Sequence, residues 1–133
     1  ESAQNCMTMD WSATMLDAAG VDAHADYPLD GRSLMPLLRD ATVFDVHPLF
    51  WRMNHRGQRA MRQGTWKYLR VDGNDYLFDL SLDERERANQ AAVEPDRLAA
   101  MCDAWEAWNA DLPAIPADAT VSLGYGIKDM PQR

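Results

Sequence analysis

Between residues 48 and 80, short apolar and aromatic runs alternate with turn signals, and this spacing constrains the fold more than any other feature. The runs occupy residues 49–52, 58–62, 66–71 and 75–80. Gly64 lies just before the third run, and Asp72-Gly73, a dipeptide typical of tight hairpin turns, lies before the fourth. Strands joined by such short turns pair antiparallel, because a parallel crossover needs a dozen or more residues. The sequence therefore predicts a four-stranded antiparallel sheet.

One long helix is predicted after the sheet. Pro95 stands at a favourable first helical position behind Glu94. Apolar residues then recur at three- and four-residue steps, at Leu98, Met101, Cys102, Trp105, Trp108 and Leu112. A stripe of this width covers one face of a sheet. We therefore expect an α+β fold over residues 48–112, with the sheet packed against this C-terminal helix, and an extended tail over 113–133.

Two shorter helical segments precede the sheet. Asp10 is a candidate N-cap for a helix over 10–19, which Gly20 would end, and Ser33 is a candidate cap for a turn of helix over 34–38. Helices this short do not fold alone. We expect them to need a partner surface.

The charge of the chain argues against two classes of partner. Acidic residues outnumber basic ones by 21 to 13, which gives a formal net charge of -8. Such an excess repels nucleic-acid phosphates, so no nucleic-acid partner is expected. No apolar run is long enough to span a membrane. The start of the chain has neither an initiator Met nor signal-peptide character, which indicates a piece of a longer chain. Localisation and a homo-oligomeric state stay open.

One basic cluster stands out in this acidic chain. Arg52, His55, Arg56 and Arg59 fall together where the first two predicted strands meet. A solvated hairpin is one interpretation. The other is a corner that faces an anion, since Arg and His suit sulfate, phosphate or carboxylate groups. The spacing of the histidines and cysteines predicts no metal site, and no catalytic or cofactor-binding residue is expected.

Four blocks of the sequence together resemble the C-terminal part of a sulfatase of the arylsulfatase-like type. Residues 9–20 are similar to the family's D-x-x-P-T-x-L-x-x-A-G segment, and residues 29–38 to its D-G-x-S-L-x-P-L-L block. Residues 59–67 resemble R-A-V-R-x-G-x-W-K, and residues 76–89 resemble L-Y-D-L-x-x-D-P-x-E-x-x-N-L. Ala13 and Glu84 replace prolines of the family pattern, which affects helix entry and turn geometry.

The resemblance implies a division of the chain within a larger enzyme. Residues 1–47 would end the large α/β domain of a sulfatase, a member of the alkaline-phosphatase-like superfamily, and connect it onward. Residues 48–112 would form the small C-terminal subdomain. The implied partners are the remainder of the parent sulfatase and, through it, a small-molecule or carbohydrate sulfate ester.

The catalytic centre of the resembled family is missing from this chain. Sulfatases make a formylglycine nucleophile from a Cys/Ser-x-Pro-x-Arg motif and hold a divalent cation, usually calcium, with Asp and Asn ligands. The nearest sequence here, residues 81–85, has Asp83 in place of the proline. The resemblance thus implies a non-catalytic fragment without a cofactor of its own. It also implies that Arg52, His55, Arg56 and Arg59 lie at the rim of the parent's substrate cleft, with His55 the strongest candidate.

Two alternatives remain at this stage. The chain could be an independent α+β module that binds a protein partner. It could also be a fragment of a related phosphate or phosphonate ester hydrolase.

Overall fold

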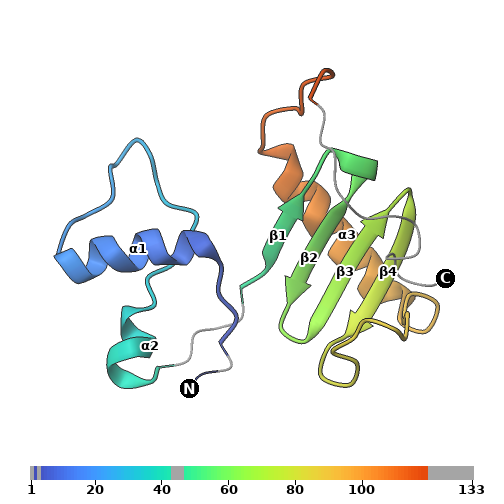
Figure 1. Cartoon of the computed structure of the whole chain (residues 1–133), viewed down its shortest axis with the longest axis horizontal. Helices are drawn as coiled ribbons and strands as arrows, with labels where there is room; N and C mark the ends of the chain where they lie inside the picture. The colour runs from blue at the N-terminus through green and yellow to red at the C-terminus, as the bar shows by residue number, and fades with distance from the viewer. Residues whose placement is uncertain (1, 3, 43–46, 120–133) are drawn as a thin grey trace. The chain divides into compact units, whose positions relative to one another are not determined.

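The computed structural model describes residues 2, 4–42 and 47–119. The chain divides into two compact units, residues 1–46 and residues 47–133, and each is described by itself. The first unit contains helices α1 (Thr8–Ala19) and α2 (Met35–Asp40) (Figure 1). The second contains four strands, the short 3-10 helix η1 (His55–Gly57) and one long helix.

Helix α1 begins earlier than the sequence predicted. Its N-cap is Met7, so the expectation that Asp10 caps the helix is wrong. Asp10 lies in the first turn instead, where its Oδ2 accepts a hydrogen bond from the Met7 N–H at 2.6 Å. A carboxylate in the first turn can reach back to the N-cap backbone as well as act as a cap itself, and the local sequence fits both arrangements. Gly20 ends the helix in the left-handed conformation, as predicted.

Polar side chains of α1 hold the segment that leads into α2. The buried carboxylate of Asp10 accepts a second hydrogen bond, from the Arg32 N–H at 2.9 Å. The hydroxyl of Thr14 accepts a hydrogen bond from the Leu34 N–H at 2.9 Å. Gly31 crosses the start of α1 so closely that a Cβ atom there would lie 2.2 Å from the Met9 carbonyl oxygen. Side chains of the first sequence block therefore hold the backbone of the second block against α1.

The start of α2 differs slightly from the prediction. The helix runs over Met35–Asp40 and its N-cap is Leu34, so the expectation that Ser33 occupies the cap position is wrong. The Ser33 hydroxyl accepts a hydrogen bond from the Met35 N–H at 3.1 Å.

The first unit buries little apolar surface of its own. Among its described residues, 2 and 4–42, the buried ones are Asp10, Ala13, Thr14 and Leu34. The large apolar side chains Trp11 and Met15 of α1 are 47% and 66% exposed. A core of this size does not support a unit of this length, so these helices need apolar partners outside the unit.

The predicted sheet is confirmed. Strands β1 (Leu49–Arg52), β2 (Arg59–Gln63), β3 (Trp66–Val71) and β4 (Asn74–Asp79) pair antiparallel in the order β1-β2-β3-β4 (Figure 1). The ends of β2 and β4 differ from the predicted bounds by one residue. The register places Met61 beside Tyr68 and Tyr68 beside Leu77, so these three side chains share one face.

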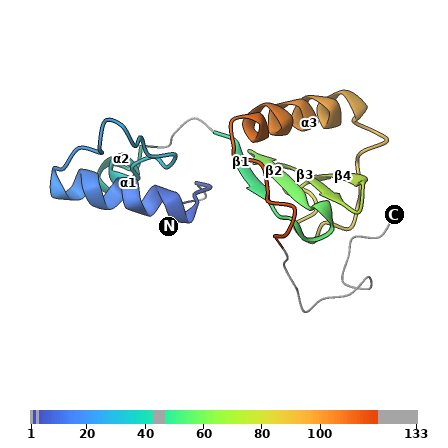
Figure 2. The ribbon, with the colours of Figure 1, turned by 90° about the horizontal axis from the view of Figure 1, so that it is seen from above.

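Helix α3 (Pro95–Ala110) covers that face, as Figure 2 shows for this unit. Met101 and Trp105 of the helix form one buried cluster with Met61, Tyr68 and Leu77 of the sheet. The helix ends before Leu112, the last residue of the predicted stripe. Residues 113–119 follow without a helix or strand, and the remainder of the predicted tail lies outside the described residues.

The segment between β4 and α3 closes the outer edge of the sheet. Asn89 Oδ1 accepts a hydrogen bond from the Leu77 N–H at 3.0 Å, and the Gln90 N–H donates to the Leu77 carbonyl at 2.7 Å. Asp83 Oδ2 accepts bonds from the N–H groups of Arg87 and Ala88 at 2.6 and 2.7 Å. The fourth sequence block therefore protects a strand edge that would otherwise be open to pairing.

Replacing Gly31 should release the segment 31–34 from α1. In a Gly31→Ala variant the new methyl group would overlap the Met9 carbonyl, so the amide protons of Arg32 and Leu34 should lose their protection in hydrogen exchange. Gly73→Ala is the matched control, because a Cβ there meets nothing within 4 Å and only its left-handed backbone is strained. Unchanged protection in Gly31→Ala would refute the close crossing.

Loss of the Trp105 side chain should be the costliest change in the core. This indole is 4% exposed, so Trp105→Ala should lower the free energy of unfolding by roughly 3–5 kcal/mol. Trp51→Ala, with a 42% exposed side chain in the same unit, should cost about 1 kcal/mol or less, and His24→Ala in a polar loop should also cost little. Chemical denaturation measures all three. Equal midpoints for the two tryptophan variants would contradict the packing described.

Candidate functional site

The four predicted site residues lie in one corner between β1 and β2. Arg52 ends β1, helix η1 (His55–Gly57) contains His55 and Arg56, and Arg59 begins β2. The chain reverses sharply because Arg56 and Gly57 both have left-handed backbones, with φ of 55° and 57°. The Met53 N–H closes the loop on the Gln58 carbonyl at 2.9 Å.

Two of the corner's guanidinium groups pair with carboxylates. Arg56 Nε donates to Asp72 Oδ1 at 3.0 Å, and its Nη2 contacts the other oxygen of the same carboxylate. Arg59 Nη1 pairs with Glu106 of α3, and its guanidinium lies 4.3 Å from the centroid of the Trp105 ring. These contacts tie the corner to the β3–β4 turn and to α3. They also neutralise part of the positive charge that the sequence suggested for this corner.

Arg52 holds the segment that follows α3. Its Nη1 donates to Asn109 Oδ1 and its Nη2 to the Pro113 carbonyl, each at 3.0 Å. Asn54 of the same corner donates from Nδ2 to the Ala119 carbonyl. Both acceptors outside the helix belong to residues 113–119, so the corner positions this segment.

A cavity of about 290 Å³ lies between the corner, α3 and the segment after it. Its polar lining residues are Arg52, Asn54, Gln58, Arg59, Glu106 and Asn109. The structure thus brings Arg52 and Arg59 to the cavity, while His55, which is half-buried, and Arg56 are not among its lining residues. Sequence reasoning missed Glu106 and Asn109. Their i, i+3 spacing on one side of the helix was the available signal.

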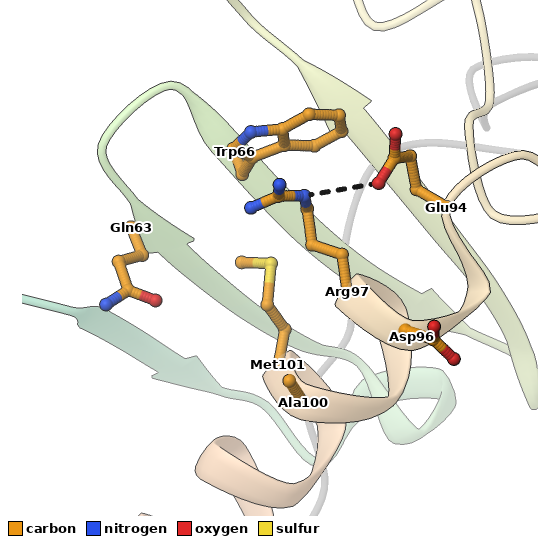
Figure 3. A pocket seen from close by; sticks show the side chains of 7 residues that line it. All are labelled: Gln63, Trp66, Glu94, Asp96, Arg97, Ala100 and Met101. Atoms are coloured by element: carbon orange, nitrogen blue, oxygen red, sulfur yellow. Dashed lines mark ion pairs between the residues drawn. The ribbon is translucent and has the colours of Figure 1, made fainter.

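A second, larger cavity of about 440 Å³ lies between the β2–β3 turn and the start of α3 (Figure 3). Arg97 extends between the Trp66 ring, 4.4 Å from its centroid, and the Glu94 carboxylate, 3.6 Å away. Figure 3 shows its guanidinium beside the indole, with Met101 and Gln63 on the other side of the opening. Arg97 therefore contacts both the Glu94 carboxylate and the Trp66 ring, and we assign these contacts to packing of α3 on the sheet.

Ionisable groups beneath the helix form a structural network. Tyr68 donates to Asp75 Oδ1 at 3.0 Å, and Arg70 Nε donates to the same oxygen at 2.5 Å. Burial opposes ionisation of Asp75, but the hydrogen bonds from Arg70 and Tyr68 outweigh it and lower the pKa of this carboxyl. Burial raises the pKa values of Tyr68 and of the free Cys102 thiol. A raised pKa leaves less thiolate, so Cys102 is a poor nucleophile.

Metal-ligating side chains do not gather in the described part of the chain. Within residues 2, 4–42 and 47–119, no three His, Cys, Asp or Glu residues are grouped so that they could hold a metal ion. No helix in these same ranges has the length and apolar character needed to cross a membrane.

The chain is similar to several solved structures, although no family model and no curated protein matches it. It superposes on Ps i-CgsB with a TM-score of 0.68 and 20% identity, covering 79% of this chain and 24% of that one. A 2-O GAG sulfatase gives a TM-score of 0.56 at 23% identity, over 73% and 23% of the two chains. The phosphonate monoester hydrolase of Agrobacterium radiobacter gives 0.52 at 22% identity, over 76% and 24%.

These likenesses identify the fold. The chain spans about a quarter of the length of the solved structures that it matches, which agrees with the C-terminal part that the four sequence blocks predicted. The chain therefore has the fold of a C-terminal part of the sulfatases.

Proposed function

We propose that this chain is the C-terminal part of a sulfate-ester hydrolase and is not catalytic by itself. The observation that carries the proposal is the agreement between four ordered sequence blocks and the superposition on sulfatase structures over most of the chain. A fold alone does not determine function, so the proposal also depends on the resemblance of the four sequence blocks to the sulfatase pattern.

The chain's role in the parent enzyme would be to complete the fold. The exposed Trp11 and Met15 of α1 would pack against the remainder of the parent, which is the partner we propose. The sheet and α3 would form the small subdomain, and the corner at residues 52–59 would lie at the rim of the substrate cleft. A carbohydrate sulfate ester is the favoured substrate class, in line with the GAG sulfatase among the similar structures.

The formylglycine and the divalent cation, expected to be calcium, would belong to the rest of the parent. The residues of this chain do not fit either group, because the sequence has no Cys/Ser-x-Pro-x-Arg motif. The described residues also offer no group of three metal-ligating side chains. We therefore assign no catalytic step to this chain.

A second candidate function has one observation in its favour. The similarity to a phosphonate monoester hydrolase supports a parent that cleaves a phosphate or phosphonate ester. The reading frame upstream of Glu1 separates an ester hydrolase of this type from an independent protein-binding module. A Cys/Ser-x-Pro-x-Arg motif and an Asp-Asp pair there would support an enzyme of the sulfatase type, and an unrelated upstream sequence would favour an independent protein-binding module.

The 133-residue chain should not hydrolyse an aryl sulfate such as 4-nitrophenyl sulfate. The reason is the missing nucleophile motif, and added calcium should make no difference. Release of nitrophenolate is followed by absorbance, in protein prepared from a host without sulfatase activity. Turnover above a buffer blank would contradict the assignment as a non-catalytic fragment.

In the full-length parent, His55→Ala should reduce kcat/KM for the native substrate. An imidazole at the cleft rim can donate a hydrogen bond to the leaving group, and its loss should cost about 1–3 kcal/mol of transition-state stabilisation. His24→Ala is the matched control, since that ring lies in an exposed loop. Wild-type kinetics for His55→Ala across several substrates would remove His55 from the rim.

A further inference from the structure

We propose that the 290 Å³ cavity beside the corner binds an uncharged, hydroxyl-bearing sugar ring rather than a free anion. As a subsite for the parent's substrate the proposal rests on the proposed function, but binding itself is a property of this chain. The sequence alone suggested an anion site, because the arginines are neighbours in the sequence and the carboxylates that pair with them are not.

The charges around the cavity disfavour a free anion. Arg59 is already paired with Glu106, whose carboxylate would repel a sulfate or phosphate at this position. Arg52 directs two of its nitrogens to neutral oxygens of Asn109 and Pro113, which fixes its guanidinium in the wall. The groups that remain are suited to hydroxyl groups, which both donate and accept hydrogen bonds.

Two polar groups in the lining have hydrogen-bonding capacity left. Among the described residues, Asn109 Nδ2 donates no hydrogen bond, and Glu106 Oε2 accepts none. Both residues line the cavity, and they lie three positions, about one turn, apart on α3. A pair of neighbouring ring hydroxyls presents the matching acceptor and donor.

Part of the lining is apolar. Met53 and Ile115 line the cavity and are 39% and 37% exposed. A pyranose ring has hydroxyl groups at its edge and C–H groups on its faces, so it suits a cavity lined by both polar and apolar side chains. The volume of about 290 Å³ lies just below the range of about 300–1,000 Å³ for ligand sites, which suits one ring rather than an extended chain.

Nuclear magnetic resonance of the ¹⁵N-labelled 133-residue chain tests the proposal directly. D-galactose, D-glucose and N-acetyl-D-glucosamine are titrated separately, with sodium sulfate as the anion and sodium chloride as the ionic-strength control. At least one sugar should shift the side-chain amide signals of Asn109 in a saturable manner, and sulfate should not. No response to any sugar, or a saturable response to sulfate at this position, would overturn the proposal.

Two variants locate the site. Glu106→Gln and Asn109→Ala should each weaken sugar binding by about three- to tenfold, since the first replaces an acceptor oxygen with a donor NH₂ group and the second removes the side-chain amide. Asp103→Asn is the control, because it removes a charge from the exposed side of the same helix. Denaturation midpoints establish that the variants are folded. Affinity unchanged in both variants would exclude this cavity.

The two proposals fail separately. Sugar binding at this site in a chain whose upstream reading frame lacks the nucleophile motif would end the sulfatase assignment and leave the sugar site standing. A sulfatase parent whose C-terminal part binds none of the sugars would end the sugar-site proposal and leave the sulfatase assignment standing.

Discussion

The second unit depends on one side chain, Trp105, because it is the place where the helix, the sheet and the corner meet. Its ring is buried against Met61, Tyr68 and Leu77. Its indole N–H donates to the Trp51 carbonyl at 3.0 Å, which links α3 to the edge strand β1. The guanidinium of Arg59 lies over the same ring. The position of the corner therefore follows from how α3 packs, and the cavity exists only because this packing leaves Arg52, Glu106 and Asn109 around it.

The sequence blocks shared with sulfatases describe architecture in this chain. Asp10 holds two backbone N–H groups that are far apart in sequence, and Asn89 does the same at the edge of β4. Asp83 holds the neighbouring N–H groups of Arg87 and Ala88. An apolar residue in place of Asp10 or Asn89 would leave part-buried backbone donors unpaired. Residues of this kind report the fold reliably and carry no information about which ester a parent enzyme cleaves.

The sheet and α3 could be predicted because their signals are local. Asp72-Gly73 specifies a tight turn, and the stripe through Met101 and Trp105 has the helical period. The first residue of α1 could not be predicted in this way, because Asp10 fits the N-cap position and the first turn equally well. The partners of the corner's arginines could not be predicted from local sequence patterns either. Arg52 and Asn109 are 57 residues apart, and Arg59 and Glu106 are 47 apart, so no sequence window contains both partners.

The same distant pairs explain how a basic cluster persists in a chain of net charge -8. Arg56 and Arg59 are neutralised by Asp72 and Glu106, so each ion pair joins the corner to another element of the unit. Surface pairs of this kind contribute little stability individually, but they fix the orientation of long side chains. A guanidinium that is held in this way cannot easily reorient to bind a free anion. It can still form part of a cavity wall, and Arg52 and Arg59 line this cavity together with Glu106 and Asn109.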